Sequence, residues 1–139
     1  MTLATRTAAG KRPYLSVFGT AYPTPDGTCI WDYIHVDDLA AAHVLALEAL
    51  ERGGPTAAYN LGTGRGYSVL EVIKAAEKVT GQKVPYRVGS RRTGDPAVLV
   101  ASAEKAITEL GWRPGYTKLE DIIATAWQWH RRKPRGFKG

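Results

Sequence analysis

Apolar residues recur every three or four positions in several segments of the chain, which is the spacing of amphipathic helices. The first helix is predicted to begin after Asp37 and to stop at Gly53. Its apolar stripe would consist of Val36, Leu39, Ala40, His43, Leu47 and Leu50. The second begins at Ser68, which can form a capping box with Glu71, and ends at Gly81. The start and stop signals therefore predict two separate helices.

Two further helices are predicted nearer the C-terminus. Ser102 is expected to cap a short helix that ends at Gly111, and Thr117 with Glu120 has the spacing of another capping box. Runs of β-branched, aromatic or apolar residues at 14–18, 30–36, 57–61 and 84–88 predict short strands. Because strands and helices alternate from residue 30 to residue 88, the pattern predicts part of an α/β sheet.

Composition limits the function classes that need to be considered. The 139 residues suffice for one domain, and the net charge is +6. Five basic residues without any acid occupy the last nine positions: Arg131, Arg132, Lys133, Arg135 and Lys138. Without them the body carries only +1, which argues against nucleic-acid binding. No apolar run is long enough to span a bilayer, so no membrane partner is expected and the predicted location is cytoplasmic.

The sequence indicates neither a metal site nor a disulfide bond. Cys29 is the only cysteine, so an intrachain disulfide and a cysteine metal cluster are both excluded, and the residue is expected to pack in the interior. The histidines His35, His43 and His130 do not form a pair with metal-ligand spacing. We therefore predict that no metal is bound.

A glycine-rich loop at 62–66 follows a predicted strand and precedes a capped helix, as phosphate-binding loops do. Its glycines have the spacing G-x-G-x-G, whereas the dinucleotide fingerprint requires G-x-G-x-x-G and an acidic residue about 20 positions later. Gln82, Lys83 and Val84 stand near that offset. The mismatch favours a tight structural turn.

A second loop carries Arg91 and Arg92, followed by Gly94 and Asp95. Guanidinium groups can bind phosphate oxygens in a bidentate manner, and the carboxylate of Asp95 can accept hydrogen bonds from sugar hydroxyls. The spacing alone fits an exposed charged turn equally well.

One catalytic pair is absent from the sequence. Short-chain dehydrogenases use Tyr-x-x-x-Lys, in which the lysine helps to hold the tyrosine ready as a base. None of the seven tyrosines has a lysine four positions later. The chain therefore lacks this catalytic machinery.

Several motifs in order resemble one known family. They include Val17-Phe18-Gly19, Asp32-Tyr33-Ile34-His35-Val36, Tyr59-Asn60-Leu61-Gly62, Arg91-Arg92-Thr93-Gly94-Asp95-Pro96 and Leu110-Gly111-Trp112. Together they resemble the C-terminal, substrate-binding part of UDP-glucose 4-epimerases, which are extended short-chain dehydrogenases. The resemblance runs from about residue 13 to residue 136 and covers about the last third of such an enzyme.

The resemblance implies an α/β fold with a small mixed sheet and about four helices, without most of the doubly wound nucleotide-binding domain. It divides the chain into an N-terminal helix remnant at 1–12, a UDP-sugar-binding domain at 13–133 and a basic tail at 134–139. In this family the N-terminal domain binds NAD and supplies the catalytic residues. We therefore expect neither catalytic residues nor bound NAD here, and we expect the chain to be inactive by itself.

Site residues carry over from the family position by position. Ser16, Val17 and Phe18 would lie along the uridine, Arg92 would contact the diphosphate, and Asp95 would contact the ribose hydroxyls. The resemblance thus implies that UDP-sugar is the ligand.

One departure from the family weakens that expectation. Trp31 stands where the family has a second phosphate-binding arginine. Loss of a charge-assisted contact costs about 1.5–3 kcal/mol, or about tenfold to a hundredfold in affinity, so UDP-sugar binding should be weak. An alternative reading is a non-catalytic module with a decayed UDP site that works by self-association or by binding a partner.

Absence of the N-terminal half would also leave apolar surface uncovered. In the family fold the 57–61 strand joins the nucleotide-binding sheet, and the first helix packs on that sheet. Alone, the chain should expose a strand edge and the stripe Leu39, His43, Leu47 and Leu50, and such surfaces favour association. We expect a homo-oligomer, a domain swap or a partner that supplies the missing half.

Overall fold

The computed structural model describes residues 2–134 and 136, and within them the chain forms five helices and five short strands. The helices are α1 (Thr2–Ala8), α2 (Val36–Glu51), α3 (Val69–Thr80), α4 (Glu104–Leu110) and α5 (Leu119–Arg132). The strands are β1 (Leu15–Phe18), β2 (Ile30–Asp32), β3 (Gly66–Ser68), β4 (Tyr86–Gly89) and β5 (Val98–Leu99). This mixed composition confirms the predicted α/β class.

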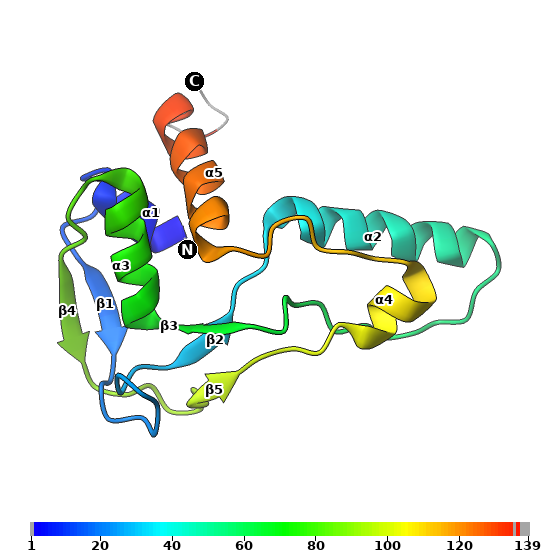
Figure 1. Cartoon of the computed structure of the whole chain (residues 1–139), viewed down its shortest axis with the longest axis horizontal. Helices are drawn as coiled ribbons and strands as arrows, with labels where there is room; N and C mark the ends of the chain where they lie inside the picture. The colour runs from blue at the N-terminus through cyan, green and yellow to red at the C-terminus, as the bar shows by residue number, and fades with distance from the viewer. Residues whose placement is uncertain (1, 135, 137–139) are drawn as a thin grey trace.

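The elements form two groups along the long axis of the molecule. Figure 1 shows α1, α3 and α5 gathered beside β1 and β4 at one end, with α2 and α4 at the other end. The three-stranded sheet, in the order β3-β2-β5, lies between the two groups. Each group has a hydrophobic cluster of its own.

The larger cluster joins α1, α3 and α5 with β1, which forms a parallel pair with β4. Val17 of β1 points into this cluster and is 1% exposed. Ile73 and Ala76 of α3 and Ile123 of α5 are buried in the same cluster. Because β1 alternates buried and exposed residues, its other face is left at the surface. That surface face carries two of the predicted site residues.

The smaller cluster is built around Trp112, whose side chain is fully buried. Its indole Nε1 donates a hydrogen bond to the backbone oxygen of Asp38 at 2.8 Å. The buried carboxylate of Asp38 accepts hydrogen bonds from the backbone nitrogens of Gly115 (2.7 Å) and Tyr116 (3.0 Å). These bonds tie the chain after α4 to the first turn of α2.

The helix-end predictions are partly confirmed. Ser68 and Glu71 form the predicted capping box, and Gly81 and Gly111 end α3 and α4 in the left-handed conformation. The N-cap of α2 is His35 and not Asp37, because the ring Nδ1 of His35 accepts from the backbone nitrogen of Asp37 at 3.0 Å.

Two predicted caps are wrong. Helix α4 begins one residue later than Ser102 would set it, with Ala103 at the N-cap and no side-chain cap. Lys118 takes the N-cap of α5, so the capping box of Thr117 with Glu120 does not form. In both cases the start of the helix is fixed by packing of buried residues, Ala106 in α4 and Leu119 in α5.

The strand predictions need two corrections. The run at 30–36 forms a strand only over Ile30–Asp32, because α2 begins at Val36. The segment 57–61 is not assigned to a strand and pairs with neither sheet. A strand requires a hydrogen-bonded neighbour, and the described part of the chain offers this segment none.

Candidate functional site

Strand β1 presents Ser16 and Phe18 on its exposed face and turns Val17 inward. Phe18 is 40% exposed, so much of its ring is open to a ligand. Val17 has its side chain in the core, and only its backbone is left to meet a ligand. Of the three predicted uridine contacts, two therefore share one surface.

A tight turn brings Arg92 and Asp95 together. The backbone nitrogen of Asp95 lies 3.4 Å from the carbonyl oxygen of Arg92, and Gly94 at the third position has a φ of +89°. A turn with positive φ at that position favours glycine, as in type II turns. Across the turn, Nε of Arg92 donates to Oδ2 of Asp95 at 2.9 Å.

The same guanidinium group lies over the ring of Phe18, with Cζ 4.5 Å from the ring centroid. The structure thus brings Phe18, Arg92 and Asp95, which are 77 positions apart at most, into one cluster. Among the described residues, the terminal nitrogens of Arg92 and Oδ1 of Asp95 make no hydrogen bond. They are positioned to meet polar groups of a ligand.

Electrostatic stabilisation within this cluster is small. The side chain of Arg92 is 58% exposed, whereas that of Asp95 is 19% exposed. An ion pair with one partner this open to solvent contributes at most about 1 kcal/mol. The pair therefore orients the two groups more than it stabilises the fold.

Sequence reasoning missed the contact that Arg91 makes. Cζ of Arg91 lies 3.9 Å from the ring centroid of the buried Tyr22. Adjacent arginines were expected to face a phosphate together, but only Arg92 reaches Phe18 and Asp95. The only sequence signal for the contact was an aromatic residue shortly after Gly19, which does not identify a partner about 70 positions away.

Trp31 lies at the centre of the three-stranded sheet, paired with Tyr67 of β3 and Leu99 of β5. Its side chain is half-buried. Within the described part of the chain, no hydrogen bond, ion pair or ring contact joins Trp31 to Phe18 or Arg92. The predicted site therefore has one arginine at its phosphate position.

The glycine loop at 62–66 is a structural turn. The carboxylate of Asp32 accepts hydrogen bonds from the backbone nitrogens of Thr63 and Gly64, both at 3.0 Å, and from the hydroxyl of Thr63 at 2.7 Å. These are the groups that a phosphate would need. Because an internal carboxylate already uses them, the loop offers no cradle for a phosphate or a dinucleotide.

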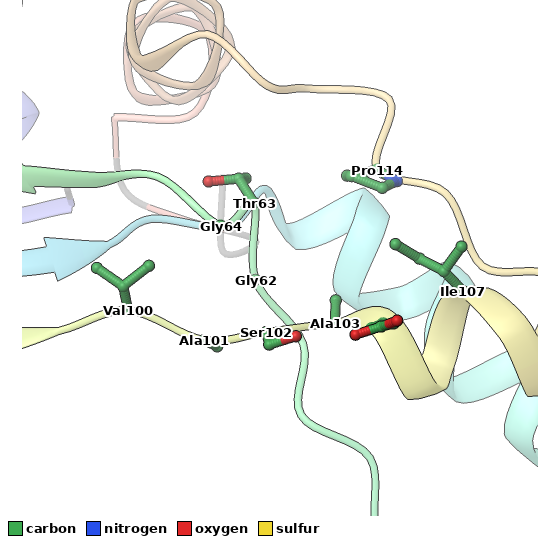
Figure 2. A pocket seen from close by; sticks show the side chains of 10 residues that line it. Gly62, Thr63, Gly64, Val100, Ala101, Ser102, Ala103, Ile107 and Pro114 are labelled. Carbon is green, nitrogen blue, oxygen red and sulfur yellow. The ribbon is translucent and has the colours of Figure 1, made fainter.

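A pocket of about 510 Å³ borders this loop. Figure 2 shows it between the 62–64 segment, the segment that carries Val100 to Ala103, and Pro114. Its lining contains the carboxylate of Glu104 but no arginine, lysine or histidine. The pocket therefore has no cation to hold a diphosphate.

A second pocket, of about 560 Å³, lies between the start of α2 and α5 and includes His35 and Thr125. His35 is already engaged, since its Nε2 lies 2.8 Å from the hydroxyl of Thr125 and its ring stacks on Tyr116 with centroids 3.8 Å apart. This histidine therefore links the N-terminus of α2 to α5.

Two groups outside this cluster have pKa values shifted by their surroundings. Burial raises the pKa of Tyr33 to about 12, so its hydroxyl stays protonated at neutral pH. Partial burial raises the pKa of Asp26, but hydrogen bonds from Ser68 and Thr28 outweigh it and hold that pKa below its usual value. Asp26 thereby fastens the 22–28 loop to the N-terminus of α3 as a carboxylate.

The apolar stripe of α2 is at the surface, as predicted. Leu39, Leu47 and Leu50 are 36%, 57% and 54% exposed, and His43 is exposed as well. Figure 1 shows α2 along the edge of the molecule, with α4 beside it. Among the described residues, nothing covers the outer face of this helix.

Neither a membrane span nor a metal centre is found in the described part of the chain. None of its helices combines the length and the apolar character needed to cross a bilayer. No group of three or more histidine, cysteine, aspartate or glutamate residues is arranged to hold a metal ion there.

Comparison with known proteins gives a consistent result. Residues 1–62 match the model of the NAD dependent epimerase/dehydratase family. The chain is 52% identical over 130 residues to a UDP-glucose 4-epimerase of Lacticaseibacillus casei, covering 94% of this chain and 39% of that protein. It is 51% identical over 138 residues to the enzyme of Bacillus subtilis (strain 168), covering 99% and 40%.

Solved structures agree with the sequence comparison. A crystal structure of a UDP-glucose 4-epimerase superimposes with a TM-score of 0.91 at 49% identity, covering 99% of this chain and 42% of that one. The enzyme of Bifidobacterium longum in complex with NAD⁺ and UDP gives a TM-score of 0.87 at 43% identity, covering 98% and 40%. The chain thus spans about two-fifths of the length of the relatives it matches.

Proposed function

The chain belongs to the UDP-glucose 4-epimerase family, and from that premise we propose that it is the part of such an enzyme that grips the UDP of a UDP-sugar. An enzyme that contains such a part would interconvert UDP-glucose and UDP-galactose, a reaction of galactose metabolism, in the cytoplasm. This chain would supply contacts to the nucleotide and not the chemistry.

The observation that carries the proposal is the convergence of Phe18, Arg92 and Asp95. The exposed ring of Phe18 offers an apolar face to a uracil base. The two terminal nitrogens of Arg92 form a fork that suits diphosphate oxygens. Oδ1 of Asp95 would accept hydrogen bonds from ribose hydroxyls, and Ser16 lies on the same strand face as Phe18.

NAD does not fit the described residues. The backbone nitrogens of the glycine loop are hydrogen-bonded to Asp32, and the adjoining pocket carries a carboxylate and no cation. Since the sequence also lacks Tyr-x-x-x-Lys, hydride transfer would depend on residues outside this chain. We therefore propose that the chain is not catalytic by itself.

The test is a two-dimensional amide NMR titration of the chain with UDP-glucose, with glucose 1-phosphate as the ligand control. Localised shifts at Phe18, Arg92 and Asp95 are expected with UDP-glucose only, and Arg92→Gln should abolish them. Arg113→Gln is the matched control, because Arg113 is an exposed arginine beyond α4. A dispersed spectrum that does not respond to UDP-glucose would refute the proposal.

A second candidate function rests on the exposed stripe of α2 and the unpaired 57–61 segment. Both features are typical of surfaces that bind another chain. In this reading the chain is a self-associating or partner-binding module, and Trp31 marks a UDP site that has lost one cation. Such association can take three forms: a homo-oligomer, a domain swap, or a complex with a partner that supplies the other half.

A further inference from the structure

We propose that Arg91 is a positioning residue whose stacking on Tyr22 holds Arg92 over Phe18 and beside Asp95. The inference rests on the proposed function in one respect, namely that Arg92 grips the diphosphate. Arg91 itself would not touch the ligand. The two neighbouring arginines would thus have separate tasks.

Gly19 is where Arg91 meets the strand pair. The backbone nitrogen of Gly19 donates to the carbonyl oxygen of Gly89 at 3.0 Å, which extends the pairing of β1 with β4 by one step. Gly19 has a φ of +92°, and a Cβ there would overlap Cγ of Arg91 and lie 3.0 Å from Cε2 of Tyr22. The missing side chain therefore makes room for the stem of Arg91.

Tyr22 is a fixed platform for the guanidinium group. It is 4% exposed, and its backbone nitrogen donates to the carbonyl oxygen of Gly27 at 2.9 Å within the 22–28 loop. Asp26 in turn ties that loop to the N-terminus of α3 through Ser68. A cation 3.9 Å from the ring centroid is well inside the range of a cation–π contact.

The contact of Arg91 constrains the residue that follows it. Arg91 is held on the side of Gly19 and Tyr22, while Arg92 lies over Phe18, the residue before Gly19. Fixing the backbone at Arg91 sets the direction in which the 92–95 turn leaves β4. A guanidinium held in place before binding loses less conformational entropy when a diphosphate arrives.

Arg91→Met removes the cation but keeps an unbranched stem over Gly19. Its first readout is the Nε–Hε NMR signal of Arg92 without ligand, which the ring of Phe18 should shift in the unmodified chain. In Arg91→Met we expect this signal to move to the position of a free arginine. Arg87→Met is the matched control, because Arg87 of β4 stacks at 4.2 Å on Tyr14, the residue before β1. It should leave the Arg92 signal in place.

The second readout is the UDP dissociation constant from calorimetry. We expect Arg91→Met to weaken binding about twofold to fivefold, the loss typical of one exposed cation–π contact. Arg91→Lys keeps the charge without the planar group, and we expect it to restore only part of the Arg92 shift. Should Arg91→Met fail to fold, Arg91→Lys against Arg87→Lys gives the same comparison.

The outcomes separate the two proposals. An unchanged Arg92 signal in a folded Arg91→Met or Arg91→Lys chain would overturn the positioning role, whatever UDP does. If the unmodified chain ignores UDP while the Arg92 signal still depends on Arg91, the proposed function fails and the positioning role stands. Loss of the Arg92 shift in Arg87→Met to the same extent would also overturn the specific role of Arg91.

Discussion

Trp31 is a residue whose replacement should tighten ligand binding. It pairs with Tyr67 and Leu99 in the middle of the sheet and offers no cation to a phosphate. We expect Trp31→Arg to tighten UDP binding about tenfold to a hundredfold, the gain of one charge-assisted contact, because the family has a phosphate-binding arginine at this position. Calorimetric titration measures this, with Trp31→Leu as the control that removes the ring and adds no charge. Equal affinities for the arginine and leucine variants would contradict the prediction.

His130 gives a residue-scale prediction about pH. Burial lowers its pKa below the usual 6.5, and the charges of Lys11 and Arg6 lower it further. Because the folded state disfavours the protonated ring, stability should fall as pH drops below about 6.5 and level off below the folded pKa. NMR titration of the ring protons should give a midpoint below 6.5, and Lys11→Gln should raise it. A midpoint above 6.5 in the unmodified chain would contradict this.

Contacts in the candidate site could be predicted where the two residues are close in sequence. Gly94 between Arg92 and Asp95 indicates a turn, and the structure places the two side chains in contact across it. The stacking of Arg91 on Tyr22 depends on how β4 lies beside β1, a pairing of distant segments that no local pattern encodes.

Among the elements, α3 has the most thoroughly satisfied N-terminus. Ser68 accepts from the backbone nitrogen of Glu71 at 3.0 Å, Glu71 accepts from that of Ser68 at 2.7 Å, and the Ser68 hydroxyl donates to Asp26. Ser68→Ala should therefore cost about 1–2 kcal/mol of folding free energy, a decrease in Tm of roughly 3–8 °C.

Ser102→Ala is the matched control, because Ser102 is exposed and caps nothing. Thermal unfolding followed by circular dichroism should show a Tm within about 1–2 °C of the unmodified chain for this variant. Equal losses in the two variants would mean that the capping box of α3 adds no stability of its own.

The contrast between these serines shows what helix-end signals predict. Glycines at the C-terminal ends were reliable because a left-handed residue suits glycine wherever it occurs, as at Gly81 and Gly111. Polar residues at N-termini are common in loops of any kind. Ser68 became a cap because α3 starts directly after β3, whereas Ser102 and Thr117 lie in connecting segments whose helices start where packing requires.

At the scale of the whole molecule, the outer face of α2 should govern association. Leu47 and Leu50 are more than half exposed on a helix whose other side packs on α4. We expect the chain to self-associate at high concentration and the double variant Leu47→Gln, Leu50→Gln to be monomeric under the same conditions. Light scattering after size exclusion measures both, with Leu99→Gln on β5 as the control for loss of one exposed leucine elsewhere. A clean monomer of the unmodified chain would contradict the prediction.

The exposed helix and the unpaired 57–61 segment also mark the limit of prediction from sequence at this scale. The apolar run at 57–61 has the composition of a strand that is buried on both faces of a sheet. Whether such a run becomes a strand depends on a neighbour, and in the described chain it finds none. The sequence predicted a strand-forming tendency, but in the structure the segment has no strand neighbour and instead packs Tyr59 and Leu61 on the Trp112 cluster.

The carboxylate of Asp32 inside the glycine loop has a practical consequence for handling the protein. The Asp32 carboxylate already accepts the hydrogen bonds that a bound anion would need in this loop. Sulfate and phosphate should therefore not bind at residues 62–66 or compete with nucleotide there. Competition between inorganic phosphate and the nucleotide is then expected at Arg92, beside Phe18, and not at this loop.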